Sequence, residues 1–290
     1  MPIISVIVPV YNGADTLAAT LTALAHQVCC VTYEVIVVDN GSTDGSVCVA
    51  KAFQSEFQNY RVVIADARKG AAYARNAGAG LARGRWLVFM DADDVPARDW
   101  LASMASGLEQ HRFVASRHDG RKLNSPVLLR ARGCPQSEGL QEYDYPKFLP
   151  HSGGCGLGVH KDLHEQLGGF DESWQMLEDT EYCWRLQLHR VKLVFLSDAL
   201  VHIRMRTDTR STVGQAFRWG SHNVRLYKRF RKHMPKIPWK KGIRWWLYFL
   251  GPRYMLNQLS DPETRPRWVW LIHWRLGRIV GSLRYRVWAL

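Results

Sequence analysis

The fold is decided first by residues 3–13, which read IISVIVPVYNG, an apolar run rich in β-branched residues that ends in polar and turn-forming ones. Such a run predicts a buried strand followed by a loop. Three similar runs follow, at Tyr33–Val38, Arg61–Ala65 and Trp86–Met90. Segments with helical spacing of apolar residues lie between and after them, at about 14–27, 44–57, 70–82 and 97–110. This alternation predicts an α/β fold with a mostly parallel sheet flanked by helices.

The second half of the chain is less regular. Residues 112–160 contain Gly, Pro and Ser residues that interrupt regular structure, and we expect strands and an acceptor loop there. A helix is predicted from Leu177 to His189, a strand at Val191–Phe195 and a further helix at Ser211–Arg231. We therefore expect an α/β domain over 1–210, with halves 1–110 and 111–210, and a helical C-terminal extension over 211–290.

Polar residues follow three of the predicted strands, at the sheet edge where parallel α/β folds bind ligands. They are Pro9-Val10-Tyr11-Asn12-Gly13, Asp39-Asn40-Gly41-Ser42-Thr43-Asp44 and Asp91-Ala92-Asp93-Asp94. The last group places three carboxylates in four residues, and their mutual repulsion would be relieved by a cation among them. Hard oxygen ligands of this kind suit Mg²⁺ or Mn²⁺. The alternative is an acidic turn in which Asp94 caps a helix starting near Pro96.

The order of these motifs resembles the family 2 glycosyltransferases. The resemblance rests on residues 5–12, 37–44, 74–78 (Ala-Arg-Asn-Ala-Gly) and 91–94, and downstream on 168–172 (Gly-Gly-Phe-Asp-Glu), 177–179 (Leu-Glu-Asp) and 184–186 (Trp-Arg-Leu). It covers roughly residues 3–205. It implies a GT-A fold and the inverting transfer of a sugar from a nucleotide diphosphate sugar, by default a UDP-sugar, to an acceptor hydroxyl.

The resemblance also implies roles for individual residues. The donor would be held by Pro9, Tyr11, Asp39, Arg75, Asp91, Ala92 and Asp93, with Asn76 supporting the loop. Asp93 and Asp91 form the metal-binding motif, with Asp94 behind them. Asp66 departs from the family pattern; it contacts the base or simply ends its strand.

A sugar transfer of this kind needs a base for the acceptor hydroxyl, and the resemblance gives that role to Asp179, next to Glu178. The alternative is that both acidic residues only favour the dipole of the helix they begin. His202, after the apolar pair Leu200-Val201, is a candidate for the diphosphate or the metal, or else a surface histidine. Trp184, Arg218 and Trp219 are expected near the acceptor or in a supporting role, the last two within a QxxRW pattern at 215–219.

Charge is distributed unevenly along the chain. Residues 201–290 carry 20 Lys and Arg against 3 Asp and Glu, whereas the whole chain has a formal charge of +13. Apolar residues from Val269 to Leu290 recur at spacings of three and four, with Arg267, Arg275, Arg278 and Arg286 expected on the opposite side. A basic amphipathic helix with tryptophans suits an anionic membrane surface, and a lipid-linked or cell-envelope glycan acceptor would suit such a location. The alternative is a helix that packs on the catalytic domain.

Other features narrow the cellular context. The six cysteines form no CxxC pair, no secretory signal is visible and no apolar run reaches eighteen residues, so we expect a cytoplasmic protein, peripheral at the inner face of the membrane. A nucleic-acid partner is not expected, because no recognisable module is present. Two other functions stay open: a nucleotidyltransferase, which would need a glycine-rich basic loop after the first strand, and a non-catalytic nucleotide-sugar-binding or scaffold relative.

Overall fold

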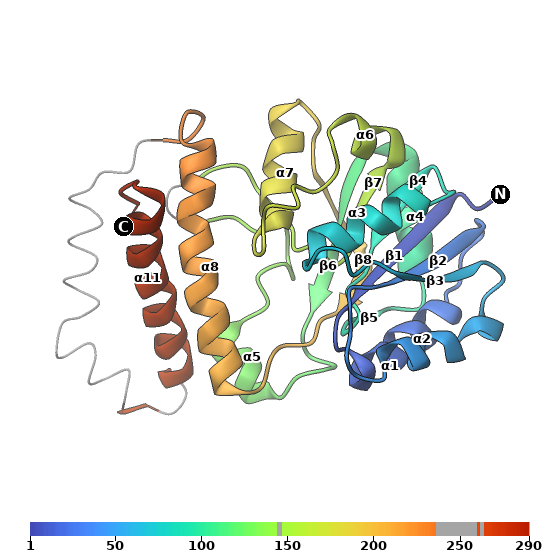
Figure 1. The fold of residues 1–290 in the computed structure, drawn as a ribbon, viewed down its shortest axis with the longest axis horizontal. Coiled ribbons are helices and arrows are strands. Elements are labelled where there is room, and N and C mark those ends of the chain that lie inside the picture. Colours follow the sequence, from blue (N-terminus) through green and yellow to red (C-terminus); the bar gives the residue numbers. More distant parts are fainter. Residues whose placement is uncertain (144–146, 236–259, 262–263, 290) are drawn as a thin grey trace. The chain divides into compact units, whose positions relative to one another are not determined.

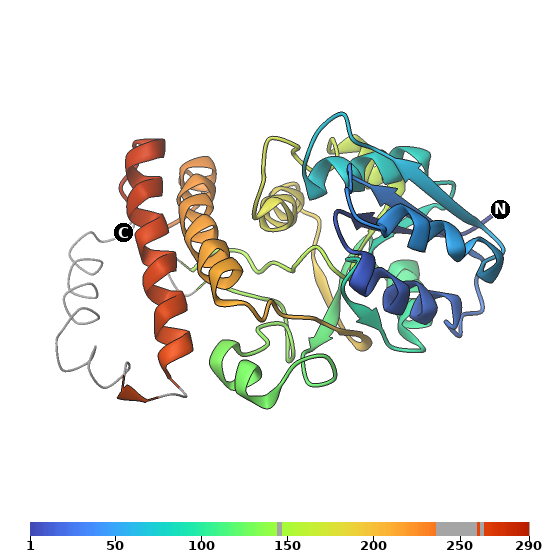
Figure 2. The same ribbon diagram turned by 60° about the horizontal axis from the view of Figure 1, so that its bottom comes forward.

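The computed structural model describes residues 1–143, 147–235, 260–261 and 264–289, which form two compact units. Unit 1 comprises residues 1–123, 135–141 and 150–204, and unit 2 comprises residues 124–134, 142–149 and 205–290. Each is described by itself (Figures 1 and 2).

Unit 1 is built on one eight-stranded sheet in the order β3-β2-β1-β4-β7-β6-β8-β5. The strands are β1 (Ile4–Val10), β2 (Tyr33–Asp39), β3 (Tyr60–Ile64), β4 (Trp86–Phe89), β5 (Val95–Pro96), β6 (Phe113–Asp119), β7 (Leu157–His160) and β8 (Val194–His202). Pairing is parallel among β3, β2, β1 and β4 and between β6 and β8. It is antiparallel where β7 joins β4 to β6 and where β5 joins β8. The predicted α/β fold with a mostly parallel sheet is confirmed.

Helices cover both faces of this sheet (Figure 1). They are α1 (Ala14–Ala25), α2 (Ser46–Ala52), the 3-10 turn η1 (Gln54–Glu56), α3 (Ala71–Leu81), α4 (Trp100–Gln110), α6 (Lys161–Gln166) and α7 (Glu178–Leu188). Side chains alternate along β1, so that Val6 and Val8 join a core with α1 and α4 while Ile7 joins a second core with α3 and α7. Both cores are fully buried, which fixes the strand register and with it the positions of the loops at the strand ends.

Side chains that follow β2 bind the backbone at the start of α1, and the sequence did not predict this contact. Ser42 Oγ accepts a hydrogen bond from the Asn12 amide, Ser46 Oγ from the Gly13 amide, and Asp44 Oδ2 from the Ala14 amide, at 2.9 to 3.0 Å. The three bonds fix the backbone that enters α1, and the one to Ala14 satisfies an N–H donor that the helix start leaves free. The helix predicted at about 44–57 is shorter than expected, because α2 begins at Ser46, with Gly45 as its N-cap, and ends at Ala52.

Asp94 does not cap a helix. Pro96 lies in β5, paired with Val201, and α4 begins only at Trp100. Asp94 Oδ1 instead accepts a hydrogen bond from the Arg204 amide at 2.7 Å. The capping alternative for the acidic cluster is therefore wrong.

Unit 2 contains α5 (Pro126–Arg132), α8 (Thr209–Phe230) and α11 (Arg265–Tyr285). The backbones of α8 and α11 approach each other at glycines: a Cβ on Gly220 would lie 1.9 Å from the Trp274 carbonyl oxygen, and one on Gly277 would lie 2.0 Å from that of Phe217. Only glycine fits at such crossings.

The amphipathic pattern predicted for the C-terminal helix needs correction at two arginines, and the first is Arg286, which is the C-cap of α11 and lies beyond its last residue, Tyr285. Arg278 is not on a solvent face; it is 4% exposed and its Nε donates to the Ala289 carbonyl oxygen at 2.9 Å. Leu276, Val280 and Leu283 are exposed on the same helix. Within the described residues, every helix is too short or too polar to cross a bilayer.

Candidate active site

A buried arginine on α3 joins two acidic motifs that are distant in the sequence. Arg75 is 3% exposed, and its Nη2 donates to Asp91 Oδ1 and its Nη1 to Glu178 Oε1, both at 2.8 Å. Burial lowers the pKa of Arg75, but the two carboxylates more than offset this and raise it. The guanidinium therefore stays charged and holds the loop after β4 beside the first turn of α7.

Asp179 lies next to this ion pair, at the second position of α7. Its Oδ2 accepts from the Gly154 amide at 3.0 Å and its Oδ1 from its neighbour's amide, that of Thr180, at 2.7 Å. Burial, and then the charge of Glu178, raise the pKa of Asp179 to about 7, even though Arg75 acts in the opposite direction. A carboxyl group with a pKa near neutrality can both accept and release a proton at the pH of a cell.

The backbone at this point is specialised. Leu177, the residue before α7, adopts the left-handed conformation with φ of 60°, which a branched side chain rarely does. Such strain is characteristic of functional sites. Gly154 lies against the arginine, because a Cβ built there would be 2.5 Å from Arg75 Nη2.

The acidic loop after β4 places its carboxylates in different environments. Asp91 is partly exposed, Asp93 is exposed and Asp94 is 5% exposed. Burial, and then the charges of Asp93 and Asp91, raise the pKa of Asp94 well above its usual value. Ligand atoms of Asp91, Asp94 and Cys155 lie within 4.8 Å of one another, the one such grouping among the described residues. Since burial keeps the Cys155 thiol protonated by raising its pKa, the carboxylates are the ligands this loop offers to a hard cation.

Asn76 connects the same helix to the loop that follows α6. Its Nδ2 donates to the Phe170 carbonyl oxygen at 2.8 Å and its Oδ1 accepts from the Phe170 amide at 2.9 Å. Gly169 has a φ of 65° and passes so close that a Cβ would lie 2.6 Å from Asn76 Oδ1. The Gly-Gly-Phe-Asp-Glu motif is thus fixed to α3 through its backbone.

The ends of β1 and β2 supply the remaining predicted donor-binding residues. Asp39 is 2% exposed; its Oδ2 accepts from the Gly41 and Ser42 amides, while its buried Oδ1 has no hydrogen-bond partner. Such an atom is one that a ligand would satisfy. Tyr11 is 54% exposed with Lys69 Nζ 4.7 Å from its ring centroid. Pro9 is in β1, one residue before its end, and Asp66 is exposed beside Gly41.

A family model described as "Glycosyl transferase family 2" matches residues 5–168, which include strands β2 to β7, nearly all of β1, Arg75 and the acidic loop, but not β8. The chain belongs to this family. Glycosyltransferase AglE of Haloferax volcanii is 40% identical over 102 residues, which make up 35% of this chain and 34% of AglE. The pre-mycofactocin glycosyltransferase of Mycobacterium tuberculosis is 29% identical over 228 residues, or 75% of this chain and 46% of that relative. The chain therefore spans less than half the length of either.

Two solved structures share the fold of this chain. The mannosyltransferase PcManGT from Pyrobaculum calidifontis, in complex with GDP-Man and Mn²⁺, has a TM-score of 0.66 at 20% identity and covers 97% of this chain and 87% of its own. S. aureus TarS 1–349 in complex with UDP has a TM-score of 0.53 at 16% identity, covering 99% and 93%. The GT-A fold implied by the sequence motifs is confirmed.

The last four predicted residues lie neither in the cluster around Arg75 nor at the ends of β1 and β2. His202 ends β8, with Nδ1 4.0 Å from Asp119 Oδ2 and without a hydrogen bond; burial, then Lys122, lower its pKa. Trp184 is 1% exposed and packs edge-on against His151 in the core of unit 1. Arg218 and Trp219 are on α8 in unit 2, where Trp219 packs against Trp270.

The sequence analysis missed Gly154 and the double ion pair of Arg75. Gly154 lies in a Gly-Gly-Cys-Gly run at 153–156, a concentration of glycine that indicates close backbone approach. The partners of Arg75 left no such signal, because a residue 103 positions away can be located only in three dimensions.

Proposed function

We propose that this chain is an inverting glycosyltransferase that moves a sugar from a nucleotide diphosphate sugar, preferably a UDP-sugar, to an acceptor hydroxyl. The observation that carries the proposal is the double ion pair of Arg75. One terminal nitrogen of its guanidinium binds Asp91 and the other binds Glu178, so the acidic loop and the Glu178-Asp179 pair lie next to the same side chain. A group transfer needs a donor site and a base within reach of each other.

The donor would lie at the carboxyl ends of β1, β2 and β4. In this proposal the unpaired Oδ1 of Asp39 accepts a hydrogen bond from the base or the ribose, and the exposed ring of Tyr11 lines the base pocket with Pro9. Asp66 lies beside that pocket. Arg75 orients Asp91 and keeps its Oδ1 engaged, which leaves Oδ2 toward the ribose or the cation.

A divalent cation, Mn²⁺ or Mg²⁺, would be held by Asp93 and Asp91, with His202 as a further candidate ligand. The fit rests on the donor set, since three carboxylates crowd one loop and the pKa of the buried Asp94 is raised by the charges of the other two. When bound, the cation supplies Lewis-acid stabilisation of the departing diphosphate.

Asp179 would take the proton of the acceptor hydroxyl as that oxygen attacks the sugar carbon from the side opposite the leaving diphosphate. A single displacement of this kind inverts the configuration at that carbon. The Gly154 and Thr180 amides orient the carboxylate, and a pKa of about 7 leaves much of it ionised at neutral pH. Glu178 would support it by holding Arg75, and Trp184, which is buried on the same helix, would have a structural role.

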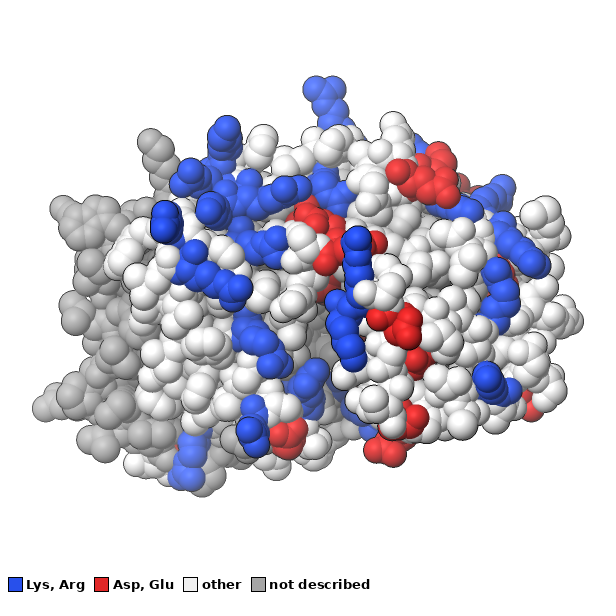
Figure 3. Space-filling view, viewed as in Figure 1, with Lys and Arg blue, Asp and Glu red and all other residues white. Residues whose placement is uncertain are grey.

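Residues 211–290 would form an extension to a catalytic domain spanning 1–210, and would place the enzyme on an anionic membrane surface at the cytoplasmic face. Leu276, Val280 and Leu283 are exposed at spacings of four and three on α11. Basic side chains gather along α8 on the face in Figure 3, with few acidic ones among them. A lipid-linked or cell-envelope glycan acceptor would be reached there, with Arg218 and Trp219 on the acceptor side.

The test is a thermal-shift screen of UDP-, GDP- and dTDP-sugars with and without Mn²⁺, followed by a transfer assay with the sugar that binds. A true donor raises the melting temperature, and more so with the ion. Asp179→Asn should keep this shift but lose transfer, whereas Asp162→Asn, on the surface of α6, should keep both. A donor-induced shift without any transfer would favour a non-catalytic relative, and full transfer by Asp179→Asn would refute the base assignment.

A further inference from the structure

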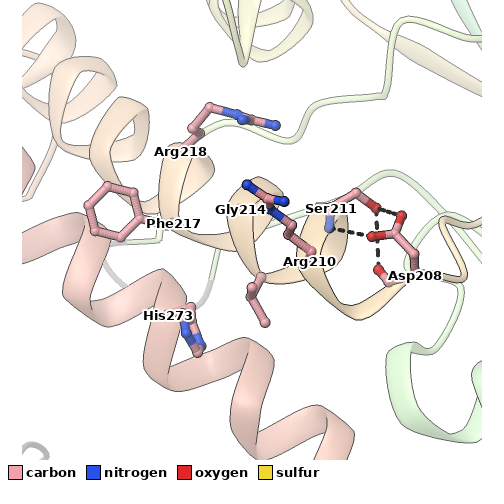
Figure 4. Close-up of a pocket in the computed structure, with 8 residues that line it drawn as sticks. Asp208, Arg210, Ser211, Gly214, Phe217, Arg218 and His273 are labelled. Atoms are coloured by element: carbon pink, nitrogen blue, oxygen red, sulfur yellow. Dashed lines mark hydrogen bonds between the residues drawn. The ribbon is translucent and has the colours of Figure 1, made fainter.

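Unit 2 contains a pocket of its own, which holds none of the residues proposed to bind the donor or to act as the base. It has a volume of about 610 Å³ and lies along the first half of α8 and the facing part of α11 (Figure 4). It is lined by Asp208, Arg210, Ser211, Val213, Gly214, Phe217, Arg218 and His273. All of these residues belong to unit 2, so the pocket is complete within that unit.

Two arginines converge over a glycine in this pocket. Arg210, Gly214 and Arg218 are spaced four residues apart and therefore form one row along α8. Figure 4 shows both arginine side chains reaching toward the turn that contains Gly214. A Cβ on Gly214 would meet Arg218 Nη1 at 3.9 Å and nothing closer, so the glycine leaves open space beneath the guanidinium. Two guanidinium groups around an open space form a site for an anion with several oxygens.

The acidic side chain of the pocket is already engaged elsewhere. Asp208 is the N-cap of α8: its carboxylate accepts hydrogen bonds from the Ser211 amide, at 2.7 Å, and from the Ser211 hydroxyl. These bonds lower the pKa of Asp208 and keep its charge at the end of the helix. Among the described residues, no ion pair to an acidic side chain is found for Arg210 or Arg218. The pocket therefore has guanidinium donors to offer to a ligand.

The remaining walls are aromatic and aliphatic, with one imidazole. Phe217 and Val213 contribute apolar surface next to the arginine row. His273 Nδ1 is held by the Val269 carbonyl oxygen at 2.7 Å on its own helix, so its Nε2 is the ring nitrogen left for a ligand. An anion bonded to the arginines could thus carry a hydrocarbon chain that packs on Phe217.

We propose that this pocket binds the phosphate or diphosphate group of a ligand, either a lipid phosphate or a free one, between Arg210 and Arg218 over Gly214. The site requires neither a nucleotide nor a divalent cation. Its use in holding a phosphate-bearing acceptor rests on the proposed function, whereas the binding itself does not.

The experiment measures binding of three probes to the full chain by isothermal titration in buffer containing EDTA: inorganic pyrophosphate, farnesyl diphosphate below its micelle concentration, and farnesol. EDTA removes the cation on which the proposed donor site depends. We expect pyrophosphate or farnesyl diphosphate to bind and farnesol to bind at least tenfold more weakly. Tighter binding of farnesyl diphosphate assigns the site to a lipid phosphate, and equal binding of the two assigns it to a free phosphate.

Two variants test the pocket by different means. Arg210→Gln with Arg218→Gln removes both charges and should weaken binding at least tenfold. Gly214→Leu keeps the charges but fills the space between them and should weaken binding by a similar factor, which guards against a double variant that does not fold. The control is Arg231→Gln, which removes one arginine charge just after α8 but outside the pocket. The proposal is overturned if both pocket variants bind as the wild type does, or if the control loses as much as they do.

Discussion

The Nη1 atom of Arg75 lies 2.8 Å from Oε1 of Glu178, although the two residues are 103 positions apart in the chain. The second terminal nitrogen of the same guanidinium, Nη2, donates a hydrogen bond to Asp91 Oδ1. One buried cation therefore sets the distance between the acidic loop after β4 and the first turn of α7, the two elements on which the proposed reaction depends.

Replacement of Arg75 should therefore affect both stability and activity. Arg75→Gln leaves the largely buried Glu178 carboxylate without its charge partner, and we expect the free energy of unfolding to fall by about 3 kcal/mol. Transfer should fall by about 100-fold or more, because Arg75 no longer holds the Asp91 loop in position beside the first turn of α7, which carries Asp179. Urea unfolding and initial rates check this. Arg68→Gln, which breaks the exposed pair with Glu172, should change stability by less than about 1 kcal/mol.

Gly154 should not tolerate even a methyl group. A Cβ there would be 2.5 Å from Arg75 Nη2, so Gly154→Ala must displace the guanidinium, at an expected cost of about 1–3 kcal/mol. Activity should fall with it, since Asp179 is also held by the Gly154 amide. The matched control is Gly80→Ala in α3, where a Cβ meets nothing within 4 Å and the better helix former should raise stability by up to about 1 kcal/mol. A Gly154→Ala protein with wild-type unfolding and rates would contradict this account of the site.

The rate of transfer should depend on the ionisation of Asp179. Its pKa is about 7 and the carboxylate is the active form, so kcat/KM should fall by about tenfold for each pH unit below 7 and level off above it. A pH–rate profile with saturating Mn²⁺ measures this. A profile that stays flat down to pH 5 would argue against Asp179 as the base.

The ionisation of Asp179 should also affect stability: the rate of transfer should rise with pH, whereas the stability of the fold should fall. The folded pKa of Asp179 is raised above the ordinary value of 3.8, so the folded state holds a proton more tightly than the unfolded state and loses stability as the pH rises through about 7. Asp179→Asn removes an unfavourable buried charge and should therefore raise the melting temperature at pH 8, but not at pH 4. A variant that is inactive yet more stable at pH 8 separates a catalytic loss from a folding defect.

The close contact between α8 and α11 should depend on its glycines. Gly277→Ala places a Cβ 2.0 Å from the Phe217 carbonyl oxygen, a backbone atom that cannot move alone, so the helices must separate and we expect a loss of about 2–3 kcal/mol. Leu283→Ala on the same helix is the control, because that side chain is 75% exposed and should contribute little. Chemical denaturation followed by tryptophan fluorescence distinguishes the two variants.

The sequence was most informative where the signal was local. The strands at residues 4–10, 33–39 and 86–89 and the helices at 71–81 and 178–188 lie within a few residues of their predicted positions, because apolar spacing and turn residues specify them within a short window. The strands β5, β6 and β7 were not predicted individually, because their segments of the sequence show no clear apolar period. Their pairing depends on partners dozens of residues away, as in Val114 with Val194.

Among the polar residues at the strand ends, the sequence did not separate ligand-binding groups from structural ones. Asp44 and Asp39 lie in the same polar loop, yet Asp44 has both oxygens in hydrogen bonds to backbone amides, whereas Asp39 keeps one oxygen without a partner. Likewise, Asp94 looked equivalent to its neighbours but is buried under the Arg204 amide. These differences arise from the packing around each side chain.

By itself, the amino-acid sequence determined the α/β class, the family and the identity of the acidic and basic groups, because periodicity and motif spacing are properties of neighbouring residues. Only the tertiary structure decided that Arg75 joins Asp91 to Glu178, that Gly154 orients Asp179, and that Arg210 and Arg218 share a pocket over Gly214. Burial, desolvation and the direction of a side chain depend on what the rest of the chain places around it, and that arrangement is specified by the whole fold.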